Sequence, residues 1–145
     1  MNTLAIFLWI YAAMICLAFA EASVEGRNAW DKKKVGLKLK FGKYVFSTYH
    51  FFSFVLMFPI LLTLPLVIYS WDSRLFGIIM SAYFSGVIIE DFCWYVVNPK
   101  VKLREFWTSF SDYFPWIKIN NKKIIPWTYV ILLAIAILFW YFFWR

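Results

Sequence analysis

The sequence predicts an all-α integral membrane protein, a bundle of four transmembrane helices with an amphipathic interfacial helix between the third and the fourth. Of its 145 residues, 63% are hydrophobic and 16% are charged, whereas soluble domains carry about 45–50% apolar and about 25% charged residues. The apolar residues fall in long blocks, which is typical of membrane spans. The basic residues gather in loops between these blocks, as topology signals do.

The first apolar block, about residues 4–20, has two interpretations. Ala18-Phe19-Ala20 followed by Glu21 resembles a signal-peptidase site, so the block would be a cleaved leader. Against this, Met1-Asn2-Thr3 carries no Lys or Arg, and cleavage would leave a basic loop on the outer face. We therefore predict a retained span with both chain ends outside.

The remaining spans are predicted over about residues 44–69, 75–97 and 127–144, within a single membrane domain that covers the whole chain. At about 1.5 Å of rise per residue, even the shortest block crosses most of a hydrocarbon core about 30 Å thick. Pro59 and Pro65 interrupt the second span. Because each lacks a backbone donor, we expect a kink or a local widening of the helix there.

Two loops, residues 21–43 and 98–126, hold thirteen of the fifteen Lys and Arg residues, and Arg74 and Arg145 are the other two. Positively charged loops stay inside, so we predict that both are cytoplasmic, in a plasma or cytoplasmic membrane. Anionic lipid headgroups are the counter-charge that we expect for them. No nucleic-acid recognition motif accompanies the charge, so nucleic acid is not an expected partner.

The two loops also carry structural patterns. Apolar and basic residues alternate from Lys34 to Phe41, a period of two that predicts a strand. Such a strand needs a partner, either its own return segment or another chain. Between Leu103 and Ile117 the apolar residues share one helical face, which predicts the amphipathic interfacial helix, ended near Pro115.

Glu90 and Asp91, adjacent carboxylates near the end of the third span, form the main candidate site together with His50. Ionisable groups inside a span cost free energy and mark functional positions. Counting from the predicted span ends puts Glu90 about 10 Å and His50 about 9 Å above the inner boundary. Cys16, Cys93 and Asn98 are secondary candidates near this layer.

Three interpretations of this layer remain open. In the first, Glu90 and His50 form a hydrogen bond or an ion pair that stabilises the bundle. In the second, the layer binds a proton or a cation. In the third, its residues act as metal ligands or as the base of an enzyme. The enzyme is the least favoured, because the chain has one histidine and no His-x-x-Glu or Glu-x-x-His spacing. We predict no cofactor and no metal site.

Small residues recur every four positions on the third span, in the rows Gly77, Ser81, Ser85 and Ala82, Gly86. Such rows let another helix approach closely. With the strand pattern and the lack of a sizeable domain outside the membrane, they favour an accessory or scaffold subunit of a larger membrane complex. Its partners would be other membrane subunits or further copies of this chain. The alternative is an autonomous membrane protein whose inner-leaflet carboxylate and His site handles a proton, a cation or a lipid-soluble substrate.

Overall fold

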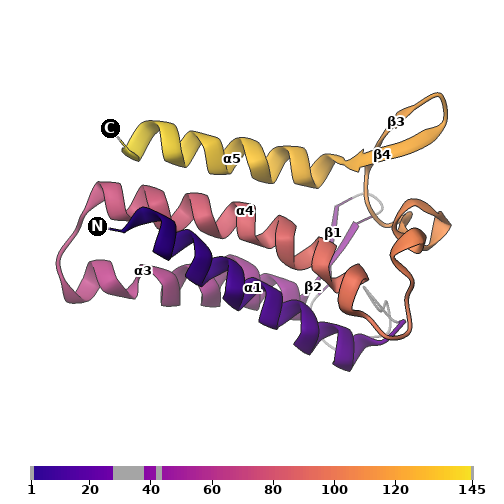
Figure 1. Cartoon of the computed structure of the whole chain (residues 1–145), viewed down its shortest axis with the longest axis horizontal. Coiled ribbons are helices and arrows are strands. Elements are labelled where there is room, and N and C mark those ends of the chain that lie inside the picture. Colours follow the sequence, from indigo (N-terminus) through magenta and orange to yellow (C-terminus); the bar gives the residue numbers. More distant parts are fainter. Residues whose placement is uncertain (1, 28–37, 42–43, 145) are drawn as a thin grey trace.

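The structure, a computed structural model, describes residues 2–27, 38–41 and 44–144 and is mostly helical (Figure 1). The helices are α1 (Thr3–Glu25), α2 (Thr48–His50), the π-helix η1 (Phe51–Met57), α3 (Phe58–Ile68), α4 (Ser73–Val97), the 3₁₀-helices η2 (Leu103–Trp107) and η3 (Ser109–Ser111), and α5 (Trp127–Trp144). Two antiparallel hairpins also lie within the described residues, β1 (Lys38–Phe41) with β2 (Tyr44–Ser47) and β3 (Trp116–Ile119) with β4 (Lys122–Pro126). The predicted all-α class is therefore corrected by these hairpins.

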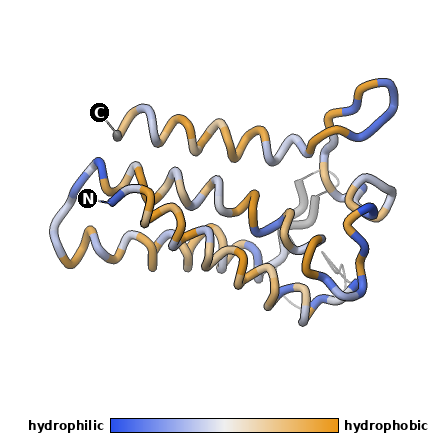
Figure 2. Tube along the Cα trace, viewed as in Figure 1, coloured by the Kyte–Doolittle hydropathy of each residue, from blue (hydrophilic) through white to orange (hydrophobic). Residues whose placement is uncertain are grey.

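Among the described residues, three helical stretches are long and apolar enough to cross a membrane: Thr3–Glu25, Thr48–Ile68 and Ser73–Val97. The last helix is apolar but shorter than these three. Figure 2 shows hydrophobic residues running along all of these helices, whereas hydrophilic residues concentrate in the connections at one end. This distribution is compatible with a membrane location.

The helix α4 is central, with α1 and α5 packed along its sides and α3 also beside it (Figure 1). Small residues allow the two closest approaches. A Cβ at Gly86 would lie 3.0 Å from Cγ of Met14 on α1, and a Cβ at Gly77 would overlap Cβ of Phe143 on α5. The small-residue rows of α4 thus face helices of the same chain.

The first helix is longer than the predicted span because nothing interrupts it before Gly26. The Asn2 side chain caps its start, accepting a hydrogen bond from a main-chain N–H. At its end Gly26 has φ of 58°, a left-handed conformation that glycine adopts without strain. The predicted boundary at Ala20 marked only the end of the apolar block. The helix continues past it, so Glu21 lies inside the helix rather than in a loop.

The strand predicted in the first loop has a partner in the same chain. Lys38 lies opposite Ser47 and Phe41 lies opposite Tyr44 in the β1–β2 hairpin; residues 34–37 of the predicted strand are outside the described residues. Because β2 uses the residues predicted to open the second span, the helix begins only at Thr48.

The expected widening of the second span is present. The π-helix Phe51–Met57 comes directly before Pro59. Proline cannot donate to the carbonyl four residues earlier, and its ring crowds that turn, so a wider i to i+5 turn accommodates it. Pro65 lies inside α3 without ending it.

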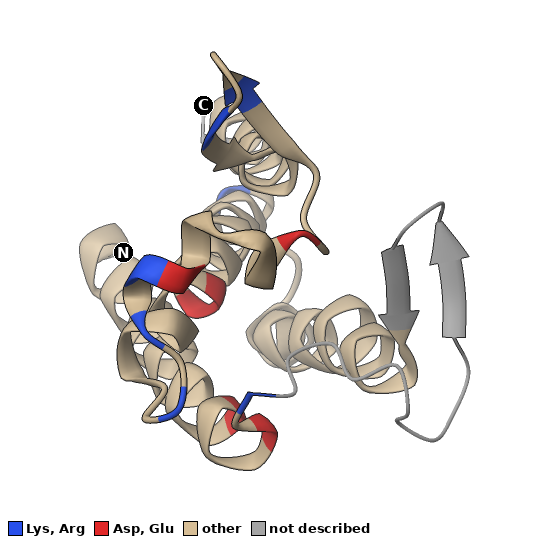
Figure 3. Cartoon of the chain, turned by 90° about the vertical axis from the view of Figure 1, so that its right-hand side faces the viewer, with Lys and Arg blue, Asp and Glu red and all other residues tan. Residues whose placement is uncertain are grey.

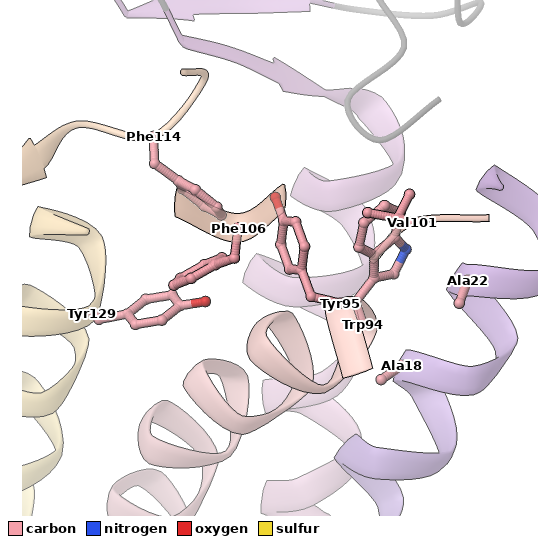
Figure 4. Close-up of a cluster of buried hydrophobic side chains, with 8 residues drawn as sticks. All are labelled: Ala18, Ala22, Trp94, Tyr95, Val101, Phe106, Phe114 and Tyr129. Carbon is pink, nitrogen blue, oxygen red and sulfur yellow. The ribbon is translucent and has the colours of Figure 1, made fainter. Parts of the chain in front are cut away.

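The predicted amphipathic helix over Leu103–Ile117 is wrong, because the segment forms two 3₁₀ turns and then β3. Side chains compete with helical hydrogen bonds there: the Ser111 hydroxyl donates to the carbonyl of Phe106, and Trp116 Nε1 donates to the carbonyl of Ser111. Phe106 and Phe114 of this segment enter a core at the end of α4, whereas Leu103 and Trp107 stay exposed. Figure 4 shows the buried residues of this core: Ala18, Ala22, Trp94, Tyr95, Val101, Phe106, Phe114 and Tyr129.

Candidate functional site

Glu90 and Asp91 are neighbours in sequence but face different helices. Successive side chains on an α-helix point about 100° apart, so the two carboxyl groups of α4 lie on separate flanks. Glu90 interacts with α1, and Asp91 interacts with α5. Glu90 is 4% exposed, and Asp91 is partly buried.

The carboxyl group of Glu90 lies within interaction range of that of Glu21 on α1. An ionised carboxylate only accepts hydrogen bonds, so a hydrogen-bonded pair of carboxyl groups must hold a proton. The hydroxyl of Tyr49 donates to Oε1 of Glu21 over 2.7 Å, which extends the pair toward α2. Three helices therefore meet at this carboxyl pair.

The carboxyl pair keeps unused hydrogen-bonding capacity. Oε1 of Glu90 is buried and has no partner among the described residues, and the same holds for Nε1 of Trp94 one turn further along α4. More than about 90% of buried polar groups in proteins are hydrogen-bonded, so an unpartnered acceptor and donor on one helix face are unusual. Within the described part of the chain, Oε1 of Glu90 is thus an acceptor whose hydrogen-bonding capacity is unused.

Negative charge accumulates around the carboxyl pair. Glu25 of α1 lies one turn beyond Glu21, and Asp91 of α4 directly follows Glu90. Like charges in apolar surroundings favour uptake of a proton or a cation. Within the described part of the chain, no three His, Cys, Asp or Glu side chains are grouped so that they could hold a metal ion. The titratable groups that interact with Glu90 include Glu21, Glu25, Asp91, Tyr49 and Tyr83.

Asp91 accepts a hydrogen bond from the Tyr129 hydroxyl of α5 over 2.7 Å. Asn98 was predicted as a secondary candidate near the same layer. Asn98 is buried and has a different role, since its Nδ2 donates to the carbonyl of Gly26 over 2.7 Å and its Oδ1 accepts from the N–H of Lys100 over 2.8 Å. This amide joins the ends of α1 and α4.

An exposed ion pair also fastens the end of α1. Arg27 donates through both terminal nitrogens to Glu105, at 3.1 and 2.7 Å, and to the carbonyl of Lys100 at 2.7 Å. Hydrogen bonding to this guanidinium lowers the pKa of Glu105 to about 2. Bidentate pairs of this kind fix geometry as well as charge. The turn after α4 therefore holds the end of α1, and with it Glu21, beside Glu90.

His50 lies closer to a helix end than the sequence suggested. It is in the first turn after Thr48, because β2 replaces the expected start of the helix, and its depth of about 9 Å stays a prediction. Its Nδ1 and the Ser47 hydroxyl are 2.6 Å apart, and its ring stacks on Phe54. Pairing of His50 with Glu90 stays a prediction; the carboxyl group within interaction range of Glu90 is that of Glu21.

The two cysteines have different surroundings, and both are free thiols. Cys16 is exposed on α1, whereas Cys93 is partly buried against the core of Figure 4. Neither has a described contact with the carboxyl pair.

Sequence reasoning missed Glu21 and Tyr129. Glu21 had a usable signal, because no Gly or Pro separates it from the first apolar block and helix C-termini favour glycine. Tyr129 had none, since its contact with Asp91 depends on how α5 is placed against α4. Both residues complete polar contacts of the candidate site.

No protein-family model, curated protein or solved structure matches this chain. Its function is therefore inferred from its own residues. Three features carry that inference: the buried carboxyl pair, the apolar helices and the basic end of the molecule.

Proposed function

We propose that this chain is a small polytopic membrane protein that takes up and releases a proton at the carboxyl pair of Glu21 and Glu90. The observation that carries the proposal is the burial of Glu90, 4% exposed with Oε1 unpartnered among the described residues, within interaction range of the Glu21 carboxyl group to which Tyr49 donates. Such a pair shares one proton, and a change in its surroundings shifts whether that proton is held or released.

The proposal places four helices across a membrane as a bundle, with both chain ends outside and the basic loops in the cytoplasm. Figure 1 supports this, because the N- and C-terminal ends lie at one end of the helices and residues 98–126 lie at the other. Figure 3 looks onto that second end, where Lys and Arg residues gather. The 18 residues of α5 extend about 27 Å at helical rise, close to a core about 30 Å thick.

Packing of α1 supports its retention as a span. Ala18 and Ala22 are buried, 0% and 2% exposed, in the core that contains Trp94. Cleavage after Ala20 would remove one of these residues from the core and separate Glu21 from the helix that carries it. A retained first helix is therefore part of the proposed proton site.

Polar side chains continue the site along the interface of α1 and α4. On the cytoplasmic side in this orientation, Tyr49 donates to Glu21. On the other side of Glu90, the Tyr11 hydroxyl lies 2.8 Å from Oγ of Ser85, which also donates to a main-chain carbonyl of α4. Hydroxyl groups relay protons because each both donates and accepts. The interface thus offers exchange partners on both sides of Glu90.

The accessory or scaffold subunit is the alternative. Two sequence features that favoured it have partners inside the chain: β1 pairs with β2, and Gly77 and Gly86 face α5 and α1. The remaining support is that the described residues form no sizeable domain beyond the helices. The proton-binding role ranks higher, because the structure adds a residue, Glu21, to the candidate site.

The test is the infrared absorption of protonated carboxyl groups in the purified protein, reconstituted in nanodiscs and titrated with pH. Glu90→Gln should remove the band that the shared proton gives near neutral pH, while the protein still inserts and accumulates. The matched control is Asp72→Asn, the same chemical change at the other end of α4, where Asp72 caps the helix. Asparagine caps a helix as well as aspartate does, so this variant should titrate like wild type.

Two outcomes would contradict the proposal. An unchanged carboxyl band in Glu90→Gln would show that the pair holds no proton. Loss of abundance, together with loss of a protein that co-purifies with wild type in stoichiometric amount in mild detergent, would favour the accessory subunit.

A further inference from the structure

A shallow cavity of about 550 Å³, largely open to the surface, is lined by the 3₁₀ turns and the β3–β4 hairpin, away from the carboxyl pair. Three lysines and one aspartate line it, which leaves a net charge of two positive, together with neutral hydroxyl and amide groups. Its charged residues and its aromatic wall are Lys118, Lys122, Lys123, Asp112 and Trp107.

The strand register places two of these lysines, Lys118 and Lys123, side by side. Lys118 lies directly opposite Lys123, and Lys122 follows the turn opposite Ile119. Like charges directly opposite each other destabilise an antiparallel pair. Two asparagines, Asn120 and Asn121, have φ of 50° and 62° and form the tight turn that holds the two strands in this register.

Only part of the positive charge is compensated by the protein. Nζ of Lys123 is 2.7 Å from Asp112 and also donates to the carbonyl of Thr108. The structure describes no ion pair for Lys118 or Lys122 within residues 2–27, 38–41 and 44–144. An anion in the cavity would offset their mutual repulsion.

Of three exposed apolar side chains in this region, Trp107 lines the cavity, and Ile119 and Ile124 directly follow Lys118 and Lys123, which line it. Trp107 is 44% exposed, Ile119 is 59% exposed and Ile124 is 49% exposed. A surface that combines basic and apolar side chains binds the boundary between lipid headgroups and acyl chains. The strand β4 is followed directly by α5 at Trp127. If α5 spans the membrane as proposed, the hairpin lies at the level of the lipid headgroups.

We propose that this cavity binds the phosphate-bearing headgroup of an anionic phospholipid in the inner leaflet. Lys118 and Lys122 pair with the phosphate, and Trp107 and Ile119 contact the start of the acyl chains. The apolar border favours a lipid over free phosphate, which would gain nothing from it. The inference rests on the membrane location proposed above but not on the carboxyl pair.

The test measures retention of phosphatidylglycerol by native mass spectrometry, after the protein is released from nanodiscs that contain phosphatidylcholine and phosphatidylglycerol. Each lysine near an anionic surface contributes about a factor of five in affinity, so Lys118→Gln with Lys122→Gln should weaken retention about 30-fold. The matched control is Lys102→Gln with Arg104→Gln, which removes the same charge outside the cavity and should retain lipid like wild type.

Unchanged retention in the cavity variant would overturn the proposal, and so would an equal loss in both variants, because that would indicate diffuse attraction to the surface. Inorganic phosphate is the second probe. If phosphate displaces the lipid from wild type at equal concentration, the cavity binds phosphate rather than a lipid, and the proposal is wrong. Extraction of the chain from native membranes by alkaline carbonate would instead refute the membrane location. The infrared test of Glu90 reports on the carboxyl pair independently.

Discussion

Tyr129→Phe isolates the hydrogen bond that joins α5 to the carboxyl group of Asp91. The hydroxyl lies 2.7 Å from Oδ2, and Tyr129 is 7% exposed. Its ring stacks on Phe106 and meets Phe114 edge-on. Phenylalanine keeps these ring contacts, so the substitution removes one O–H donor and little else.

The size of the effect follows from the two partners. Hydrogen bonds to charged groups contribute about 1.5–3 kcal/mol in soluble proteins, whereas interhelical hydrogen bonds within membranes average about 0.6 kcal/mol, with a maximum of about 1.7 kcal/mol. Because Asp91 is a partly buried carboxyl group, we expect Tyr129→Phe to lower the free energy of unfolding by about 1–2 kcal/mol. The matched control is Tyr11→Phe, which removes a hydroxyl from a neutral partner, Ser85, and should cost about 0.5 kcal/mol.

The assay is equilibrium unfolding in mixed micelles, followed by tryptophan fluorescence, for Tyr129→Phe, Asp91→Ala and the double variant. If the two side chains interact, their effects are not additive, and the coupling should reach about 1 kcal/mol. The reasoning is refuted if Tyr129→Phe costs no more than Tyr11→Phe, or if the effects add within about 0.3 kcal/mol. Either result would mean that α5 does not hold Asp91.

Two further predictions concern packing and acid stability. Gly77→Ala should destabilise the fold by about 1–3 kcal/mol, because the added Cβ would overlap Phe143 of α5. Gly86→Ala should destabilise it less, because the nearest atom belongs to the flexible side chain of Met14. The reverse order in the same unfolding assay would contradict the described packing. The pKa of Glu105 is lowered from 4.5 to about 2 by hydrogen bonding to Arg27, so the ion pair adds stability above pH 4.5 that disappears as pH falls toward 2. Unfolding of wild type and Glu105→Gln should therefore differ near neutral pH, less so at high salt because the pair is exposed, and a difference that persists at pH 2 would contradict this assignment.

Structural features that depend on the composition of many residues were predictable from the sequence. Features that depend on a few specific hydrogen bonds were not. The apolar blocks predicted long helices, and Pro59 predicted the widening that the π-helix provides. The periodicity over Leu103–Ile117 predicted a helix that is absent, because the hydrogen bonds of Ser111 and the burial of Phe106 favour compact turns.

By itself, the sequence determined that the chain has long apolar helices and a basic end, since the transfer free energy of apolar side chains adds up residue by residue along each segment. Only the tertiary structure decided that Glu21 pairs with Glu90, that Tyr129 donates to Asp91, and that the hairpin lysines surround a cavity. Each of these contacts joins two elements, and its geometry depends on the relative placement of both. Local composition carries no information about that placement.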